Sequence, residues 1–103
     1  MKVTVDLCLI PLGGEASLSI YIARCQRVLE DAGLHHELHA YGTNIEGDYD
    51  TVMAAIKRCH ELVHEMGAPR IFSSIKLGSR IDREQSLRDK VLSVQQKMES
   101  PDA

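Results

Sequence analysis

Residues 3–10, which read VTVDLCLI, alternate between two sets of side chains. Successive side chains of a β-strand point to opposite faces of its sheet, so this alternation predicts a strand that Pro11 and Gly13–Gly14 bring to an end. The apolar set is Val3, Val5, Leu7 and Leu9, and the mixed set is Thr4, Asp6, Cys8 and Ile10. The strand therefore has one strongly apolar face.

A helical pattern follows, with apolar residues three and four positions apart up to Ala32. Ser17 suits the N-cap position, because its side-chain oxygen can accept from an early backbone N–H. Gly33 stands where helices often end in the left-handed conformation. The apolar positions of this helix are Leu18, Tyr21, Ile22, Cys25, Val28, Leu29 and Ala32.

Residues 34–41 alternate again and predict a second strand, and residues 43–47, TNIEG, predict a short return strand. Gly42 separates the two. We expect Gly42 to supply backbone dihedrals that a β-carbon would penalise, so that the two strands form a tight hairpin.

A second helix is predicted from Asp48 or Asp50 to Met66, because acidic residues suit the positive end of the helix dipole. Gly67 and Pro69 end it. Its predicted buried stripe is Val52, Ile56, Cys59, Val63 and Met66.

A fourth strand is predicted for residues 70–78, RIFSSIKLG. Asp82, with Gln85 three residues later, then predicts a third helix that begins with a capping box. Its apolar seam is narrow and consists of Leu87, Val91, Val94 and Met98. The tail ESPDA, residues 99–103, is expected to fray.

The predicted order is β-α-β-β-α-β with an additional C-terminal helix. This is the ferredoxin-like α+β pattern, an antiparallel four-stranded sheet with two helices on one face. A chain of 103 residues suits a single domain, 1–103.

The sheet face without helices must be covered or polar. Its predicted side chains are too polar for a core and too apolar for plain solvent: Asp6, Cys8, Ile10, Glu37, His39, Tyr41, Ser74 and Lys76. The face is therefore either an oligomer interface or a ligand site. The apolar seam of the third helix has no evident partner within a ferredoxin-like core, which favours a dimer or tetramer.

Composition narrows the classes of partner. The formal net charge is −3 and no basic stripe is visible, which argues against nucleic acid. Three dispersed cysteines without a CxxC motif indicate a reducing compartment. No signal peptide is recognisable, and no apolar run approaches the roughly 20 residues of a membrane span. We expect a cytoplasmic protein without membrane partners.

Residues 60–64, HELVH, match the HExxH motif of zinc peptidases. The match is weak, because both histidines flank the buried stripe and no later residue offers a third ligand. Surface histidines are the simpler interpretation, and we expect neither a metal nor another cofactor. Cys25 and Cys59 lie on buried stripes, where cysteine acts as a small hydrophobe, whereas Cys8 faces the open side of the sheet.

Three stretches carry a resemblance to a known family: VDLCLIPLGGEASLSIYIA, HAYGTNIEGDYDTVMAAI and RIFSSIKLGSRIDREQSLRDKV. Together they resemble the small, one-domain YkoF-like thiamine-binding proteins, over nearly the whole chain from Val3 to about Met98. Ser79 departs from the threonine expected there, and the second glycine of PLGGEAS is an addition. The resemblance implies a ferredoxin-like fold, dimers that assemble into tetramers, and binding of thiamine or its hydroxymethylpyrimidine part without catalysis.

An aminopyrimidine places a ring nitrogen beside an exocyclic amine, an edge that a carboxylate can pair with and that amides or hydroxyls complete. A thiazolium cation suits an acidic or aromatic lining. The candidate ligand-binding residues are Asp6, Ser17, Ser19, Tyr41, Thr43, Asn44 and Glu46. Simpler roles exist for several of them: Ser17 as a cap, Thr43 and Asn44 as turn residues, and Glu46 as a solvated strand residue. Glu46 is favoured as a site residue because it has no evident structural role in the sequence.

Two functions therefore follow from the sequence. The first is non-enzymatic binding of thiamine or its pyrimidine precursor. The alternative is a structural or regulatory oligomer without a small-molecule ligand, and a metal-dependent hydrolase is a distant third.

Overall fold

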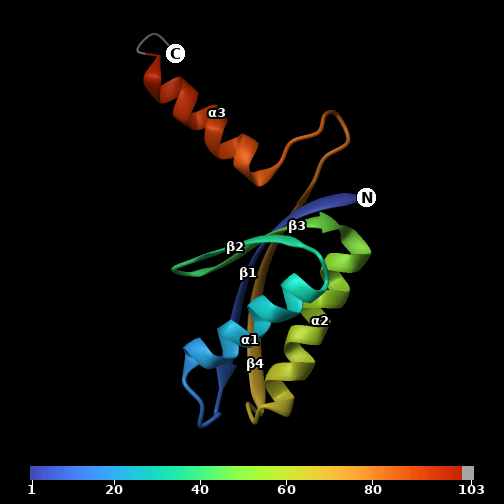
Figure 1. Cartoon of the computed structure of the whole chain (residues 1–103), viewed down its shortest axis with the longest axis vertical. Coiled ribbons are helices and arrows are strands. Elements are labelled where there is room, and N and C mark those ends of the chain that lie inside the picture. Colours follow the sequence, from blue (N-terminus) through green and yellow to red (C-terminus); the bar gives the residue numbers. More distant parts are fainter. Residues whose placement is uncertain (101–103) are drawn as a thin grey trace.

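The computed structural model describes residues 1–100 and has the predicted α+β order. Two helices lie against one face of a four-stranded antiparallel sheet, and a third helix stands apart from this body (Figure 1). The ferredoxin-like class is confirmed. The elements are β1 (Lys2–Leu12), α1 (Leu18–Asp31), β2 (His35–His39), β3 (Gly42–Asp48), α2 (Tyr49–Glu65), β4 (Arg70–Ser79) and α3 (Leu87–Glu99).

The strand order in the sheet is β2-β3-β1-β4, so β1 occupies a central position between β3 and β4. The alternation predicted for β1 is confirmed, because its four apolar side chains are buried beneath α1 and α2 while Asp6 and Cys8 lie on the open face. The core is aliphatic apart from Tyr21, and consists of Val3, Val5, Leu7, Leu9, Tyr21, Cys25, Leu29, Leu34, Ile45, Val52, Ala55, Ile56, Cys59, Val63 and Ala68.

The β2–β3 hairpin turns at Ala40 and Tyr41, and Gly42 is already the first residue of β3. The prediction that Gly42 adopts special dihedrals is wrong: positive φ angles occur, within residues 1–100, at Gly13, Gly33 and Gly67. Gly42 is required by close approach instead. A β-carbon there would lie 2.7 Å from the Leu7 carbonyl oxygen and 3.0 Å from Asp6 Oδ1.

The third helix begins later than predicted. Ser86 is the N-cap of α3, and its side chain and that of Asp89 form a reciprocal capping box. Asp82 and Gln85 instead bind the guanidinium of Arg80 in the loop before the helix. The predicted start at Asp82 is therefore wrong, because the ion pair with Arg80 fixes a loop conformation there.

The seam of α3 is exposed, since Val91 keeps 56% and Met98 80% of its surface accessible. The molecule is consequently long and narrow, with principal extents of 53 × 28 × 20 Å. The fraying predicted for the tail falls mainly on residues 101–103, which lie outside the described part.

Among residues 1–100, no helix is both long and apolar enough to cross a membrane.

Candidate functional site

The alternation of β3 divides the candidate residues between the two faces of the sheet. Thr43 points to the helix side and is only 5% exposed. Asn44 and Glu46 point to the open face, and Asp6 pairs in register with Asn44 on that same face. A single ligand therefore cannot touch all of them from one side.

A groove beside the end of β1, lined by residues from both faces of the sheet, brings together one group of candidates. It lies between the N-terminal half of α1, the end of β1 and the tip of the hairpin, and its volume is about 630 Å³. Ser19, Tyr41 and Thr43 line it. Its apolar wall consists of Leu7, Leu9, Ile10, Leu18, Ile22, Leu29 and Leu38.

The size and lining of this groove suit a small heterocycle. Its volume is 630 Å³, within the usual range for small-molecule pockets, and most of its lining is aliphatic with a few polar groups. No Asp or Glu is among the described residues that line it. The groove therefore offers apolar contact and neutral hydrogen-bonding groups to a ligand.

The polar groups of the groove come from α1 and β3. Gln26 Nε2 donates to Thr43 Oγ1 over 3.0 Å, which ties the middle of α1 to the hairpin. This bond uses the Thr43 oxygen as an acceptor, so the Thr43 hydroxyl proton and Gln26 Oε1 stay available to a ligand. Sequence reasoning missed Gln26. Its spacing from Ile22 (four residues) and Leu29 (three residues) was the signal, because it places the amide on the sheet-facing side of the helix.

Ser17 and Ser19 mark the beginning of α1. Ser17 occupies the predicted N-cap position with an extended backbone, but its side chain makes no capping bond within the described chain. Its Oγ lies 3.2 Å from Ser19 Oγ instead. The predicted capping interaction is therefore wrong, and Ser17 adjoins the groove through Ser19.

Asp6 is held by a histidine on the open face. His39 Nε2 donates to Asp6 Oδ1 over 2.9 Å, and this pair crosses β3 above Gly42. The absence of a side chain at Gly42 leaves the space that the pair occupies. His39 also borders the groove, so it connects the Asp6 carboxylate with the groove's rim.

Glu46 has a structural partner that the sequence did not reveal. Its Oε2 accepts from the backbone N–H of Leu87 over 3.1 Å, at the first residue of α3. Its other oxygen lies 3.7 Å from His35 Nε2, and the side chain is 12% exposed. The premise that Glu46 lacks a structural role is wrong, because it anchors the N-terminus of α3 to the sheet.

Asn44 and Asp6 line a separate, shallow hollow of about 280 Å³ on the open face. Thr4, Lys76 and Leu87 also border it. The seven candidates therefore form two groups, one at the groove (Ser17, Ser19, Tyr41 and Thr43) and one on the open face (Asp6, Asn44 and Glu46).

The two histidines of HELVH have structural partners. His60 Nε2 forms a 2.6 Å hydrogen bond with Ser73 Oγ, and His64 Nδ1 donates to the Ala68 carbonyl oxygen over 2.8 Å. Burial, and to a lesser extent the charge of His64, lowers the pKa of His60. Within residues 1–100, no three His, Cys, Asp or Glu side chains are grouped so as to hold a metal ion.

The cysteines occupy the predicted environments. Cys25 and Cys59 are buried, and Cys8 is half-buried on the open face. The Cys59 thiol lies 3.8 Å from the Cys25 carbonyl oxygen. Hydrogen bonding to Cys25 and burial raise the pKa of Cys59, so this thiol is a packing group rather than a nucleophile.

Comparison with known proteins identifies the family. The model that describes thiamine-binding proteins matches residues 5–95. The chain belongs to the thiamine-binding protein family. The predicted resemblance is confirmed.

A UPF0045 protein of Synechocystis sp. is 57% identical over 100 residues, which cover 97% of this chain and 83% of that protein. A UPF0045 protein of Eremothecium gossypii is 39% identical over 95 residues, which cover 91% and 90%.

Solved structures of the thiamine-binding fold agree with this one. A protein from Methanocaldococcus jannaschii is 34% identical, with a TM-score of 0.83 over 91% of this chain and 96% of that one. A Thermotoga maritima protein, proposed to act in thiamine biosynthesis or salvage, has a TM-score of 0.77 over 91% and 99%. It is 20% identical and shares the fold. The family is described by binding and not by a reaction.

Proposed function

We propose that this protein binds thiamine, or its hydroxymethylpyrimidine part, without catalysing a reaction, and that the groove between α1 and the hairpin is the site. The observation that carries the proposal is the Gln26–Thr43 pair in an otherwise apolar groove, in a chain of the thiamine-binding family. A ring that enters the groove gains apolar burial and keeps its polar edge satisfied.

The Gln26–Thr43 pair matches the edge of an aminopyrimidine. The Thr43 hydroxyl would donate to the ring nitrogen, and Gln26 Oε1 would accept from the exocyclic amine. This assigns to a neutral pair the role that we predicted for a carboxylate. The prediction that Asp6, Asn44 and Glu46 contact the ligand stays a prediction. These three residues would contact a ligand that binds on the open face of the sheet.

Tyr41 suits the cationic part of thiamine. It lies at the turn of the hairpin, borders the groove and is 87% exposed in the isolated chain. A thiazolium over its ring would gain cation–π attraction, which is about 0.5–1 kcal/mol at an exposed site. Ser19 at the opposite wall would supply a further hydroxyl.

Calorimetric titration with thiamine, hydroxymethylpyrimidine and the thiamine phosphates tests this proposal. We expect saturable binding of one ligand per chain, with thiamine binding more tightly than the pyrimidine if Tyr41 contacts the thiazolium. If no heat of binding is measured with any of these compounds at millimolar concentration, the protein does not bind them. The alternative function, a structural or regulatory oligomer, would then be favoured.

We also propose that the chain self-associates as a dimer or tetramer. Ile10 and Phe72 are cross-strand neighbours on the open face and are both exposed, as are Val91, Val94 and Met98 on α3. Burial of such surface is what stabilises oligomers. Light scattering should give two or four times the chain mass of 11.5 kDa, and a monomer at high micromolar concentration would refute this.

A reducing compartment such as the cytoplasm fits the cysteines. All three thiols are free, and the two on the helices are buried.

A further inference from the structure

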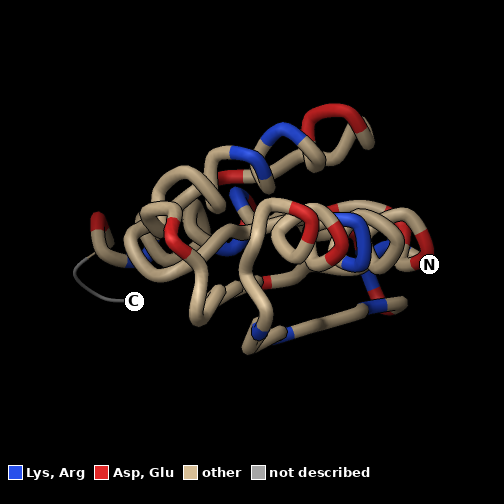
Figure 2. Tube along the Cα trace, turned by 90° about the horizontal axis from the view of Figure 1, so that it is seen from below, with Lys and Arg blue, Asp and Glu red and all other residues tan. Residues whose placement is uncertain are grey.

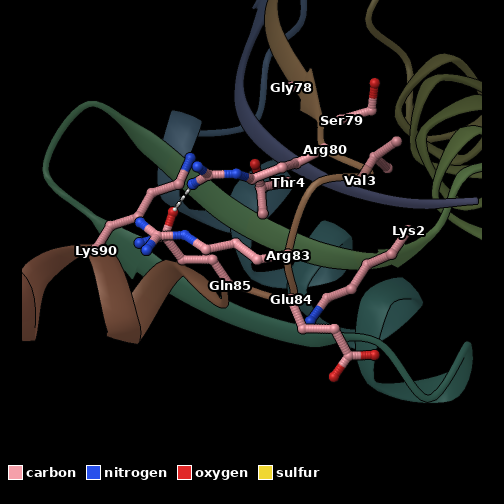
Figure 3. A pocket seen from close by; sticks show the side chains of 10 residues that line it. All are labelled: Lys2, Val3, Thr4, Gly78, Ser79, Arg80, Arg83, Glu84, Gln85 and Lys90. Carbon is pink, nitrogen blue, oxygen red and sulfur yellow. Dashed lines mark hydrogen bonds between the residues drawn. The ribbon is translucent and has the colours of Figure 1, made fainter.

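A second hollow lies at the far end of the sheet and is lined by basic side chains. It has a volume of about 380 Å³ and lies between the start of β1, the end of β4 and the loop that leads to α3. Four of the chain's 12 lysines and arginines line it: Lys2, Arg80, Arg83 and Lys90. Figure 3 shows the nitrogen-bearing ends of Arg80, Arg83 and Lys90 turned toward one region of this hollow.

This positive charge is only partly offset, since Asp82 also lies near Arg83 and Asp89 lies near Lys2. Arg80 pairs with Asp82, and a hydrogen bond from Arg80 is the main cause that lowers the pKa of Asp82 to about 2. The ion pairs among residues 1–100 include none of Lys2, Arg83 and Lys90. Glu84 is the one carboxylate among the described residues of the lining. The hollow thus gathers positive charge in a chain whose net charge is −3.

Lys90 lies in the first turn of α3, which begins at Leu87. The helix dipole is positive at this end, and the carboxylates of Asp89 and Glu46 already offset it. Acidic and basic residues are interspersed along the chain (Figure 2). A bound anion would offset the repulsion among the cations that line the hollow.

We propose that this hollow binds an oxyanion of the phosphate class, either free phosphate or pyrophosphate, or the phosphate group of an ester. The guanidinium of Arg83 suits bidentate contact with phosphate oxygens, and Lys90 adds a point charge beside it. The hydroxyl of Thr4, which also lines the hollow, adds a donor.

This anion site is distinct from the groove. The hollow reaches Thr4 and the groove reaches Leu7, three residues apart on β1, which corresponds to about 10 Å along a strand. The two sites can therefore be tested separately, with and without thiamine.

The experiment is a calorimetric titration of the full chain with inorganic phosphate, pyrophosphate and glycerol 3-phosphate. The test variant is Arg83→Gln/Lys90→Gln, and the matched control is Arg24→Gln/Arg27→Gln, which removes the same charge from α1. We expect the test variant to bind pyrophosphate at least about tenfold more weakly and the control to bind within about twofold of the parent. Binding should also weaken as sodium chloride is added.

Two outcomes would refute the proposal. Equal weakening in the control would mean that overall charge attracts the anion, and no binding by the parent would mean that the hollow is not a site. Lys90→Gln alone, on the exposed face of α3, provides a second variant if the double variant does not fold. Tighter binding of glycerol 3-phosphate than of phosphate would identify an ester as the ligand, and the reverse order would identify the free anion.

Discussion

Glu46 Oε2 accepts a hydrogen bond from the backbone N–H of Leu87 over 3.1 Å, across a separation of 41 residues. The bond places a carboxylate at the positive end of α3 and joins that helix to β3. A helix N-terminus has unpaired N–H groups, and a negative side chain stabilises it through both hydrogen bonding and the dipole. The position of α3 therefore depends on a residue of the sheet.

Glu46→Gln should loosen α3 without unfolding the sheet. The change keeps the shape but removes the charge, so we expect a cost of about 0.5–1 kcal/mol at the α3 anchor. Hydrogen exchange should become faster in residues 87–92, and Glu37→Gln, on the same face, is the control for a lost charge.

The same variant decides between the two groups of candidate residues. If Glu46 contacts the aminopyrimidine, Glu46→Gln should weaken thiamine binding by about 1.5–3 kcal/mol, or roughly ten- to a hundredfold. If the groove is the site, thiamine affinity should be unchanged.

Thr43→Val should weaken thiamine binding about tenfold. The substitution keeps the shape but removes the hydroxyl, which leaves Gln26 Nε2 without its acceptor and the ligand without a donor. Titration calorimetry measures the effect, and Thr43→Ser, which retains the hydroxyl, should bind nearly as well as the parent. Unchanged affinity in Thr43→Val would exclude the Gln26–Thr43 pair as the ligand contact.

Gly42→Ala should destabilise the fold by about 2 kcal/mol or more, because a β-carbon would lie 2.7 Å from the Leu7 carbonyl oxygen. Gly78→Ala is the matched control in β4, since its β-carbon would meet Thr4 Oγ1 at an ordinary 3.5 Å. Urea denaturation compares the two. Equal stability of both variants would show that β3 can shift to make room.

Stability should fall as the pH drops below about 6.5, in part because of His60. Burial lowers the pKa of His60, so below its ordinary value the unfolded chain binds a proton that the folded chain resists. His60→Gln can keep a hydrogen bond to Ser73 but cannot titrate. The variant should lose less stability than the parent between about pH 7.5 and pH 5.5, and an identical loss would assign the effect to other groups.

The sequence by itself determined the elements and their faces. The alternation of β1 and the three-and-four spacing of α1 and α2 identified most of the core, because burial on one face imposes the period of the secondary structure on the apolar residues. The family was also recognisable, since its motifs are distinctive in combination. The start of α3 was missed because two capping signals, at Asp82 and at Ser86, compete within a few residues.

Tertiary structure alone decided which side chains meet. Strand pairing brings His39 to Asp6 across Gly42, and the packing of α1 brings Gln26 to Thr43. The path of the chain after β4 brings Leu87 to Glu46. Each contact joins residues that are distant in sequence, so no local pattern records it: periodicity fixes the face on which a side chain lies, whereas its partner depends on how the elements pack together.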